Sequence, residues 1–321
     1  MKKQKRVRLM PLVSWLLLAV CLNCNTVDSP PKAPAGKTPY EYFVELSAIP
    51  RCSSNEEAAS NYLMAFALSL GLDVVQDEMF NVLVRKKGSK GRGNEPPVIL
   101  QAHIDMNCTK DDEAGHDFEA DPIVPVITDD GWIRAEKRAT LGADNGGGVS
   151  MIMAVLASKR ISHPPIEALL TTQEELGLIG ADFFDVSLLA GRRLINLDIT
   201  TEKALVVSST RDDGNEIVIP FAPAALAKIA NLPDWLYRDD SPLRDRMAEV
   251  FREFYGSEPV FAGINNRVAG IECLVFAHRI PDIDMVAIGP NLLGIHTPDE
   301  RMCLSSYNRV HDYLVRVLAA L

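Results

Sequence analysis

A short apolar segment that ends in a histidine and a carboxylate constrains this chain more than any other feature. The pattern from Val98 to Met106 predicts a buried strand that ends by delivering His103 and Asp105. Because alternate side chains of a strand share a face, these two can point into the same cavity. A histidine ligand held by a second carboxylate is the usual arrangement at a metal ion. Taken alone, the His-x-Asp pattern is equally compatible with a polar strand end in solvent.

Further acidic residues and a histidine occur where other apolar segments end. They are Asp144, Glu174, Glu175, Asp198 and His296. The carboxyl ends of the strands in an α/β sheet line one crevice, so we expect these groups to converge with the first two. Any one of them could instead be a solvated loop residue or a helix cap, and Asp144 in particular could be an N-cap. Five such groups at strand ends are hard to explain as caps.

The predicted crevice is strongly acidic and needs a compensating cation. Carboxylates that share a cavity repel one another and raise each other's pKa, and divalent metal ions remove this repulsion. Because the candidate ligands supply nitrogen and oxygen but no thiolate, they fit zinc, or alternatively manganese or cobalt. The cysteines in the body of the chain form no Cys-x-x-Cys pair, so we expect no zinc–thiolate site. One disulfide is possible among them, without a pairing that the sequence decides: Cys52, Cys108, Cys273 and Cys303.

Helical and strand patterns alternate along the chain. Helices are predicted over residues 39–49, 58–70, 149–157, 242–255 and 305–321, and strands over 72–76, 81–86, 98–106, 123–127, 132–135, 166–172, 193–197 and 283–288. This order predicts an α/β fold with a mixed central sheet and helices on both of its faces. Ser54 and Glu57 form a plausible capping box for the second helix. His116, His163 and His311 have no motif context, and we expect them at the surface or on helices.

The motifs around the candidate residues resemble, in the same order, those of the aminoacyl-histidine dipeptidases. They are Gln-Ala-His-Ile-Asp-Met at 101–106, Leu-Gly-Ala-Asp-Asn-Gly at 141–146, Thr-Gln-Glu-Glu-Leu-Gly at 172–177, Asn-Leu-Asp at 196–198 and Gly-Pro-(x5)-His-Thr-Pro-Asp-Glu at 289–300. These enzymes are co-catalytic zinc metallopeptidases, a group that includes carnosinases, aminoacylases and carboxypeptidase G-type enzymes. The resemblance runs from about Tyr40 to the C-terminus and includes Ile-Pro-Arg-Cys-Ser at 49–53 and Gly-Ile-Glu-Cys at 270–273. It implies a zinc-dependent exopeptidase catalytic domain over residues 39–321.

The resemblance implies a set of ligands for two zinc ions. His103 and Asp198 would hold one ion, and Glu175 and His296 would hold the other. Asp144 would bridge the two ions, and the peptide bond after it would be cis. Such a strained peptide is expected only at a functional site.

Two more residues would act in catalysis without holding metal. By the same resemblance, Asp105 would orient His103. Glu174 would be the general base that takes a proton from the attacking water and later passes it to the leaving amine. The adjacent Glu174 and Glu175 would therefore divide the work, one as base and one as ligand.

The chain departs from the resembled family after the last aspartate ligand. The family inserts a second domain there, a lid, whereas here the catalytic-domain pattern resumes at Leu232. We expect residues 209–232 to be a short linker in place of the lid. A lid histidine that helps stabilise the oxyanion would then be missing, together with groups that grip the substrate carboxylate. Many relatives dimerise through the lid, so we expect a monomer. Val268 also stands where the related dipeptidases carry a histidine.

The N-terminus has the features of an export signal. Basic residues between Lys2 and Arg8 precede an apolar run from Leu9 to Leu22 that is short for a membrane span. We expect residues 1–24 to be a signal peptide and 25–38 a spacer. The segment resembles a bacterial lipoprotein signal, in which Cys21 or Cys24 would be lipidated; cleavage nearby or an uncleaved anchor are the alternatives. We expect a periplasmic or outer-surface protein that touches the membrane only through this segment.

Charge and motifs together define the function we expect. A net charge of −10 over 321 residues argues against nucleic acid as a partner. The sequence predicts an exported di-zinc metallopeptidase that hydrolyses dipeptides or short peptides. A catalytically silent, metal-containing surface protein that binds peptides or a partner protein is the alternative from another class. Hydrolysis of N-acyl amino acids would use the same site and is not separated by the sequence.

Overall fold

The computed structural model describes residues 10–11, 36–210, 234–265 and 271–321. Its helices are α2 (Pro39–Ser47), α3 (Glu57–Ser69), α4 (Ala143–Ala157), α5 (Ile179–Phe183), α7 (Pro242–Tyr255), α8 (Cys273–Arg279) and α9 (Leu304–Ala320), with a short 3₁₀ helix at Val186–Leu188. Its strands are β1 (Met10–Pro11), β2 (Asp73–Gln76), β3 (Val82–Lys86), β4 (Val98–His103), β5 (Pro125–Ile127), β6 (Trp132–Ala135), β7 (Ile166–Thr171), β8 (Arg193–Asn196), β9 (Ala204–Thr210), β10 (Val260–Asn265), β11 (Asp284–Ala287), β12 (Leu292–Leu293) and β13 (Arg301–Cys303).

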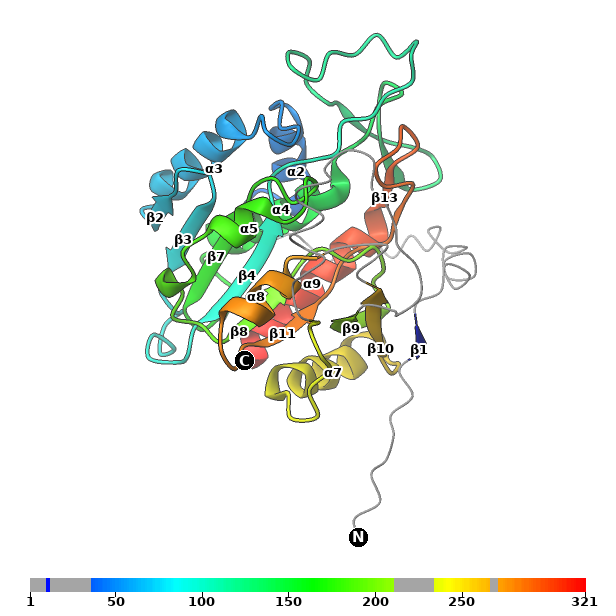
Figure 1. The fold of residues 1–321 in the computed structure, drawn as a ribbon. Helices are drawn as coiled ribbons and strands as arrows, with labels where there is room; N and C mark the ends of the chain where they lie inside the picture. Colours follow the sequence, from blue (N-terminus) through cyan, green and yellow to red (C-terminus); the bar gives the residue numbers. More distant parts are fainter. Residues whose placement is uncertain (1–9, 12–35, 211–233, 266–270) are drawn as a thin grey trace.

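One large mixed sheet forms the centre of the molecule. Its strand order is β1-β10-β9-β11-β8-β4-β7-β3-β2. The central strands β8, β4 and β7 are parallel neighbours, whereas β2, β3 and β9 join the sheet through antiparallel pairings. Because the three central strands run in the same direction, their carboxyl ends, and the loops that follow them, lie along one edge (Figure 1).

Helices cover both faces of this sheet. Alternate residues of β4 enter different cores: Val98, Leu100 and Ala102 pack into one core with residues of α2, α3, α4, α7 and α9, while Ile99 packs into another with residues of α5 and α8. A strand buried on both faces is expected to be apolar throughout, which explains the continuous apolar run of β4. The mixed sheet with two helical layers confirms the predicted fold class.

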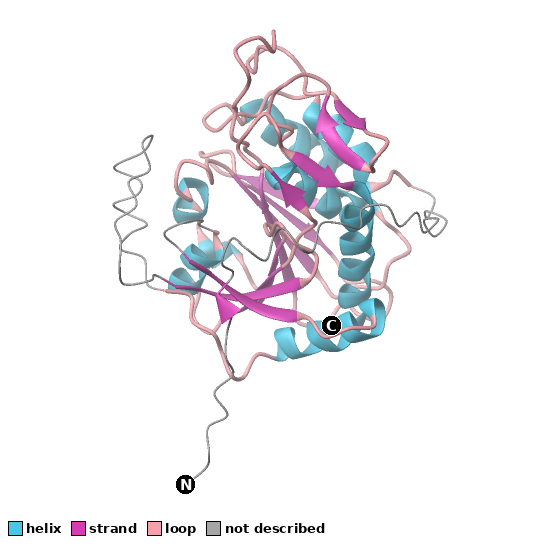
Figure 2. Cartoon of the chain, turned by 90° about the vertical axis from the view of Figure 1, so that its right-hand side faces the viewer, coloured by secondary structure: helices cyan, strands magenta, loops and turns pink. Residues whose placement is uncertain are grey.

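A smaller antiparallel sheet lies apart from the large one, with the order β12-β13-β6-β5 (Figure 2). The predicted strands 123–127 and 132–135 belong to it as β5 and β6. Strands β12 and β13 flank the loop that carries His296 and pair with each other, so this sheet anchors both ends of that loop. Strands β9, β10, β12 and β13 have no counterpart among the predicted strands.

The predicted capping box at Ser54 and Glu57 is wrong. Helix α3 begins at Glu57, and its N-cap residue is Glu56. The side chain of Ser54 makes no capping bond to this helix. The capping box lies instead at α2, where the Thr38 hydroxyl accepts from the backbone N–H of Glu41 and the Glu41 carboxylate accepts from the backbone N–H of Thr38. The helix begins at Glu57, three residues after Ser54, and the Glu56 carboxylate accepts from the Ser54 N–H at 2.8 Å.

Two of the unassigned histidines are buried rather than at the surface. His116 is 3% exposed and packs edge-on against Phe118, and His163 is 2% exposed with Nδ1 2.7 Å from the carbonyl oxygen of Pro164. His311 lies on α9, as expected. Periodicity alone missed the two buried histidines because each lies in a loop that folds against the core.

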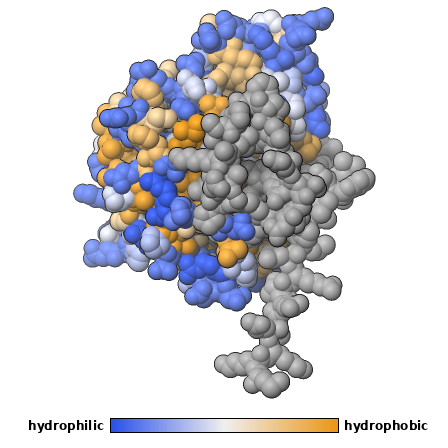
Figure 3. Space-filling view, in the orientation of Figure 1, coloured by the Kyte–Doolittle hydropathy of each residue, from blue (hydrophilic) through white to orange (hydrophobic). Residues whose placement is uncertain are grey.

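Much of the predicted leader and linker lies outside the described residues. This applies to the predicted signal peptide and spacer except residues 10–11 and 36–38, and to the predicted linker from residue 211 onward. In the part of the chain that is described, every helix is too short or too polar to cross a membrane. On the face shown in Figure 3, hydrophilic residues surround several patches of apolar ones.

Candidate active site

The predicted site residues lie along the edge of the large sheet where its central parallel strands end. His103 is the last residue of β4, and Asp105 follows it. Glu174 and Glu175 follow β7, and Asp198 follows β8. Two residues come from elsewhere: Asp144 lies at the start of α4, and His296 lies in the loop between β12 and β13.

Asp144 lies between the two histidines. One of its carboxylate oxygens, Oδ1, is 3.0 Å from Nε2 of His103, and the other, Oδ2, is 3.3 Å from Nε2 of His296. The peptide bond between Asp144 and Asn145 is cis, as the resemblance implied. A carboxylate that presents one oxygen to each of two ligand groups has the geometry of a bridge.

His103 has further carboxylates around it. Its Nε2 atom is 3.7 Å from Oδ1 of Asp198 and 4.0 Å from Oε2 of Glu174. Its other ring nitrogen, Nδ1, is 3.3 Å from Oδ1 of Asp105 and 3.1 Å from the backbone oxygen of the same residue. Asp105 therefore contacts the nitrogen that faces away from Asp144, which is the contact that an orienting role requires. We call His103, Asp105, Glu174 and Asp198 the His103 half.

His296 has one further carboxylate beside it. Its Nε2 atom is 2.9 Å from Oε2 of Glu175. The second oxygen of Glu175, Oε1, is buried and has no hydrogen-bond partner among the described residues. We call His296 and Glu175 the His296 half. All seven predicted residues are thus brought together, with Asp144 between the two halves.

The donor atoms fit divalent metal ions. Ligand atoms of His103, Asp144 and Glu175 lie within 4.8 Å of one another. The donors are imidazole nitrogens and carboxylate oxygens, which suit zinc, manganese or cobalt. A buried carboxylate oxygen without a partner is costly unless a cation or a donor satisfies it, so Glu175 Oε1 is a second observation that points to a cation.

Known proteins are similar to this chain in both sequence and fold. The sequence profile of peptidase family M20/M25/M40 matches residues 99–320, about two thirds of the chain. The chain belongs to this family.

Two curated proteins match shorter stretches. The cytosol non-specific dipeptidase of Escherichia coli (strain K12) is 40% identical over 163 residues, which are 51% of this chain and 33% of that protein. The uncharacterized protein YqjE of Bacillus subtilis (strain 168) is 26% identical over 157 residues, or 46% of this chain and 39% of that protein. The alignments therefore cover between a third and two fifths of these relatives.

Solved structures share the fold. The aminoacylhistidine dipeptidase from Vibrio alginolyticus superposes with a TM-score of 0.78 at 22% identity, over 88% of this chain and 96% of that one. A tripeptidase from Staphylococcus aureus gives 0.70 at 18% identity, over 88% and 97%. At these identities the likeness establishes the M20 catalytic-domain fold. M20 peptidases typically depend on two metal ions, and the candidate metal site of this chain lies at the edge where its central strands end.

Burial and neighbouring charges shift the pKa values of several residues of the M20 site. Burial raises the pKa of Glu174 well above its usual range, and burial together with Asp144 raises the pKa of Asp198 to about 8. Burial acts against the charge on His296, but its hydrogen bonds to Asp144 and Glu175 outweigh this and raise its pKa to about 10. Divalent cations can supply the compensating charge that a group of buried carboxylates needs.

Asp105 is fixed by more than its histidine. The Ser53 hydroxyl donates to Oδ2 of Asp105 at 2.7 Å, and the backbone N–H groups of Glu174 and Glu175 donate to the same carboxylate at 3.1 and 3.3 Å. Burial raises the pKa of Asp105, but its contact with His103 outweighs this and lowers it overall. Asp105 thus ties the ends of β4 and β7 together. The sequence analysis missed Ser53, although the quoted Ile-Pro-Arg-Cys-Ser motif contains it.

Three more buried charged residues surround the site. Glu272, at the start of α8, accepts from the hydroxyl of Thr171 at 2.7 Å and from the side-chain amide of Gln101. Arg51 and Glu300 are each 1% exposed. All three residues lie in the motifs quoted for the family resemblance, but a motif alone gave them no role. Glu300 is part of the segment that also holds His296.

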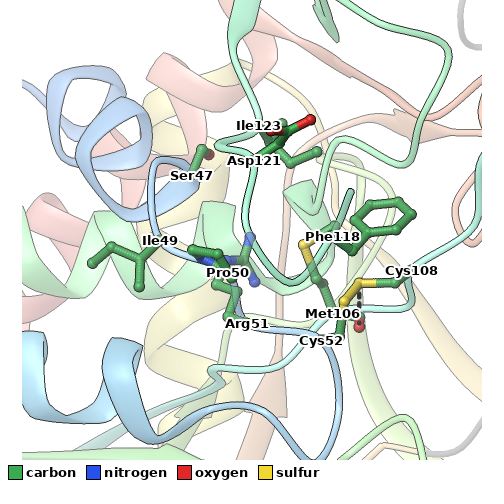
Figure 4. A pocket seen from close by; sticks show the side chains of 10 residues that line it. All are labelled: Ser47, Ile49, Pro50, Arg51, Cys52, Met106, Cys108, Phe118, Asp121 and Ile123. Carbon is green, nitrogen blue, oxygen red and sulfur yellow. Dashed lines mark hydrogen bonds between the residues drawn. A yellow bond between two sulfur atoms is a disulfide. The ribbon is translucent and has the colours of Figure 1, made fainter. Parts of the chain in front are cut away.

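A disulfide joins the two loops behind the His103 half. Cys52 and Cys108 are bonded, and Figure 4 shows the bond beside Met106 and Phe118. Cys52 precedes Ser53, whose hydroxyl binds Asp105, and Cys108 lies three residues after Asp105. The bond therefore connects the segment of Ser53 to the segment of Asp105. Cys273 and Cys303 are free and buried.

Proposed function

We propose that this chain is an exported di-zinc peptidase that hydrolyses dipeptides or short peptides. The observation that carries the proposal is the position of Asp144, with one oxygen toward each histidine and a further carboxylate on either side. His103 and Asp198 would hold one ion, Glu175 and His296 the other, and Asp144 both. The membership in the M20 family supports peptide hydrolysis.

The residues of the chain divide the chemistry among them. A pair of zinc ions would supply Lewis acidity, which polarises the scissile carbonyl and lowers the pKa of water. Glu174 would take the proton from the attacking water and deliver it to the leaving amine. Its carboxylate lies 4.0 Å from His103 Nε2, within the cluster, and its backbone is fixed by Asp105. Burial keeps its pKa high, which suits a group that must hold a proton between these two steps.

The names of the similar proteins favour short peptides as substrates. The names of the similar proteins include a non-specific dipeptidase, an aminoacylhistidine dipeptidase and a tripeptidase. With a linker in place of the lid, the site would lack the groups that grip a free C-terminal carboxylate. We therefore propose that the enzyme removes N-terminal residues from short peptides as well as cleaving dipeptides, and that it acts as a monomer.

Export is supported by the N-terminal signal pattern and by the Cys52–Cys108 disulfide, since disulfides persist in oxidising compartments. We propose a periplasmic or outer-surface location with a lipid anchor at Cys21 or Cys24. Cell fractionation with antibody detection tests the location, and labelling with a radioactive fatty acid tests the anchor. Recovery of the protein in the cytosolic fraction alone would refute export.

The activity is tested with the purified full-length chain loaded with zinc. It is assayed against dipeptides, including Xaa-His, and against longer peptides, with Glu174→Ala as the control. Turnover that this substitution abolishes supports the proposal, and cleavage confined to dipeptides would refute the relaxed specificity. Two bound ions without turnover of any substrate would favour the silent binder, and light scattering that shows a stable dimer would refute the monomer. Failure to bind any divalent ion would refute the assigned site.

A further inference from the structure

Two buried residues of opposite charge, Arg51 and Glu300, bind the backbone beside Asp144. We infer that Arg51 and Glu300 are positioning residues that hold the Asp144 segment in place between the two histidines. This inference rests on the proposed function, because it concerns the carboxylate that would bridge the two ions. It assigns a task to two charged side chains that are each 1% exposed.

Glu300 binds the backbone on both sides of Ala143. Its Oε2 accepts from the N–H of Gly142 at 2.8 Å, and its Oε1 accepts from the N–H of Asp144 at 3.0 Å. Both carboxylate oxygens are thus used by the segment that enters α4. Because Glu300 lies four residues after His296, it also fixes the spacing between the His296 loop and Asp144.

Arg51 binds the same segment from the other side. Its Nη2 donates to the carbonyl oxygen of Gly142 at 2.6 Å. Its Nη1 donates to the carbonyl oxygen of Ile104 at 2.8 Å and to that of Asp105 at 3.3 Å. Arg51 therefore connects the end of β4, which carries His103, to the start of α4. Figure 4 shows its side chain running beside Met106.

Gly142 is the point where the two contacts meet. Its N–H is held by Glu300 and its carbonyl oxygen by Arg51, so the peptide groups beside it are fixed in both directions. Three segments that are far apart in sequence, those with His103, Asp144 and His296, are joined here by two side chains. A carboxylate that must serve both ions needs a fixed backbone, because a displacement of about 1 Å is enough to lower a rate by about 100-fold.

The glycines of the Leu-Gly-Ala-Asp-Asn-Gly motif make room for the guanidinium. A Cβ atom on Gly142 would lie 2.5 Å from Nη2 of Arg51, and the backbone φ angle there is +69°. A Cβ atom on Gly146 would lie 2.6 Å from the same Nη2 atom. By contrast, a Cβ atom on Gly147 would only approach Sδ of Met302 at 3.2 Å. The chain therefore offers a matched pair of helix substitutions, one that displaces Arg51 and one that does not.

The main test uses Glu300→Gln and Arg51→Lys in the full-length chain, with Asp284→Asn as the control. Asp284 is also a buried carboxylate that accepts from a backbone N–H, that of Leu243, but it lies at the opposite end of the strands. Cobalt(II) is titrated into each metal-free protein while its visible spectrum, the number of bound ions and the melting temperature are recorded. Turnover of a dipeptide is then measured to separate kcat from KM.

We expect Glu300→Gln and Arg51→Lys to weaken binding of the second cobalt ion by at least about tenfold, to change the visible spectrum and to lower kcat with little change in KM. We expect Asp284→Asn to lower the melting temperature without these changes. Folded Glu300→Gln and Arg51→Lys proteins with the parent's affinity and spectrum would overturn the inference. The parent's failure to bind cobalt would instead refute the proposed function, and the inference with it.

If Glu300→Gln and Arg51→Lys do not fold, the substitutions at Gly146 and Gly147 provide a second test. Gly146→Ala should weaken binding of the second cobalt ion and change the spectrum, because the new methyl group displaces the guanidinium. Gly147→Ala should retain the parent's affinity and spectrum, because Met302 can adjust. Equal cobalt binding by these two variants would overturn the inference.

Discussion

The two halves of the site are built in different ways, although each contributes one histidine and one carboxylate to the proposed ligand set on its side of Asp144. His103 ends a central strand and has a side chain that is 1% exposed, with Asp105 and the sheet fixing its ring. His296 lies in a loop, its side chain is 44% exposed, and its backbone has a φ angle of +62°. Non-glycine residues rarely adopt this conformation. The His103 half is therefore fixed by the core, whereas the His296 half depends on a loop.

This difference shows where each half obtains its rigidity. The loop of His296 is tied at its far end by Glu300, and within it the hydroxyl of Thr297 donates to the carbonyl oxygen of Gly294 at 2.7 Å. The His103 half has strand pairing on both sides and the Asp105 contacts beneath it. We therefore expect substitutions in the His103 half to affect both stability and metal binding. Substitutions in the His296 half should affect mainly metal binding and have little effect on stability.

The largest expected effect separates the two adjacent glutamates, which belong to different halves. Glu174→Gln should lower kcat by about 10²–10⁴-fold, because it removes the general base, while both ions remain bound. Glu175→Gln should instead release the ion of the His296 half, because it removes a ligand. Elemental analysis and steady-state kinetics on both variants distinguish these outcomes. If Glu174→Gln retained activity within tenfold of the parent, the base would have to be another residue.

Substitution of each histidine tests the comparison directly. Loss of a group that merely orients a ligand typically costs 10- to 100-fold in metal affinity, so loss of a ligand should exceed about 100-fold. In the metal-free protein, His103→Ala should also lower the free energy of unfolding by about 3–5 kcal/mol, because it leaves buried carboxylates without their partner. His296→Ala should lower it by about 1 kcal/mol or less, because its ring is partly solvated. Metal titration and urea unfolding measure both quantities, and equal losses of stability would contradict the difference between the halves.

The sequence predicted the residues of the His103 half more completely than the residues that hold the ligands in place. Strand periodicity and the position of a polar residue at a strand end indicated His103, Glu174 and Asp198, because the ends of parallel strands must meet at one edge. His296 was also expected in this crevice, but it follows a loop rather than a long strand, and only the motif resemblance gave it a ligand role. The small sheet that anchors its loop was predicted only in part, since strands of two or three residues leave almost no pattern.

The residues that hold the ligands were not predictable from local patterns. Arg51 contacts Gly142, 91 positions away, and Glu300 contacts the same residue from 158 positions away. Such contacts depend on the tertiary fold, and a lone arginine or glutamate in a sequence is normally a surface residue. The cysteine pairing is similar: Cys52 and Cys108 are 56 positions apart, and nothing in their spacing favoured them over other pairs.

The disulfide should support the His103 half more than the His296 half. Removal of the bond by Cys52→Ala together with Cys108→Ala should lower the free energy of unfolding by about 2–4 kcal/mol, because the bond closes a long loop in the unfolded chain. Turnover should fall as well, because Ser53 is then less well fixed against Asp105. Thermal melting with and without reductant measures the first effect. Reductant should lower the melting temperature of the parent but not that of the double variant. If the reductant opens the bond and the parent's melting temperature does not change, the disulfide does not stabilise the protein.

The smallest expected effect concerns the surface of the His296 loop. Arg138 contacts Asp111 at 2.8 Å and Asp299 at 2.5 Å, and all three side chains are largely exposed. Because exposed ion pairs are screened by solvent and salt, Arg138→Ala should leave the melting temperature unchanged within error. Asp299 nevertheless lies three residues after His296, so the loop should lose part of its restraint. We expect a modestly faster exchange of the ion in the His296 half, measured by competition with a chelator, and an unchanged rate for the ion in the His103 half. Equal acceleration of both rates would mean that the loop does not act on one half alone.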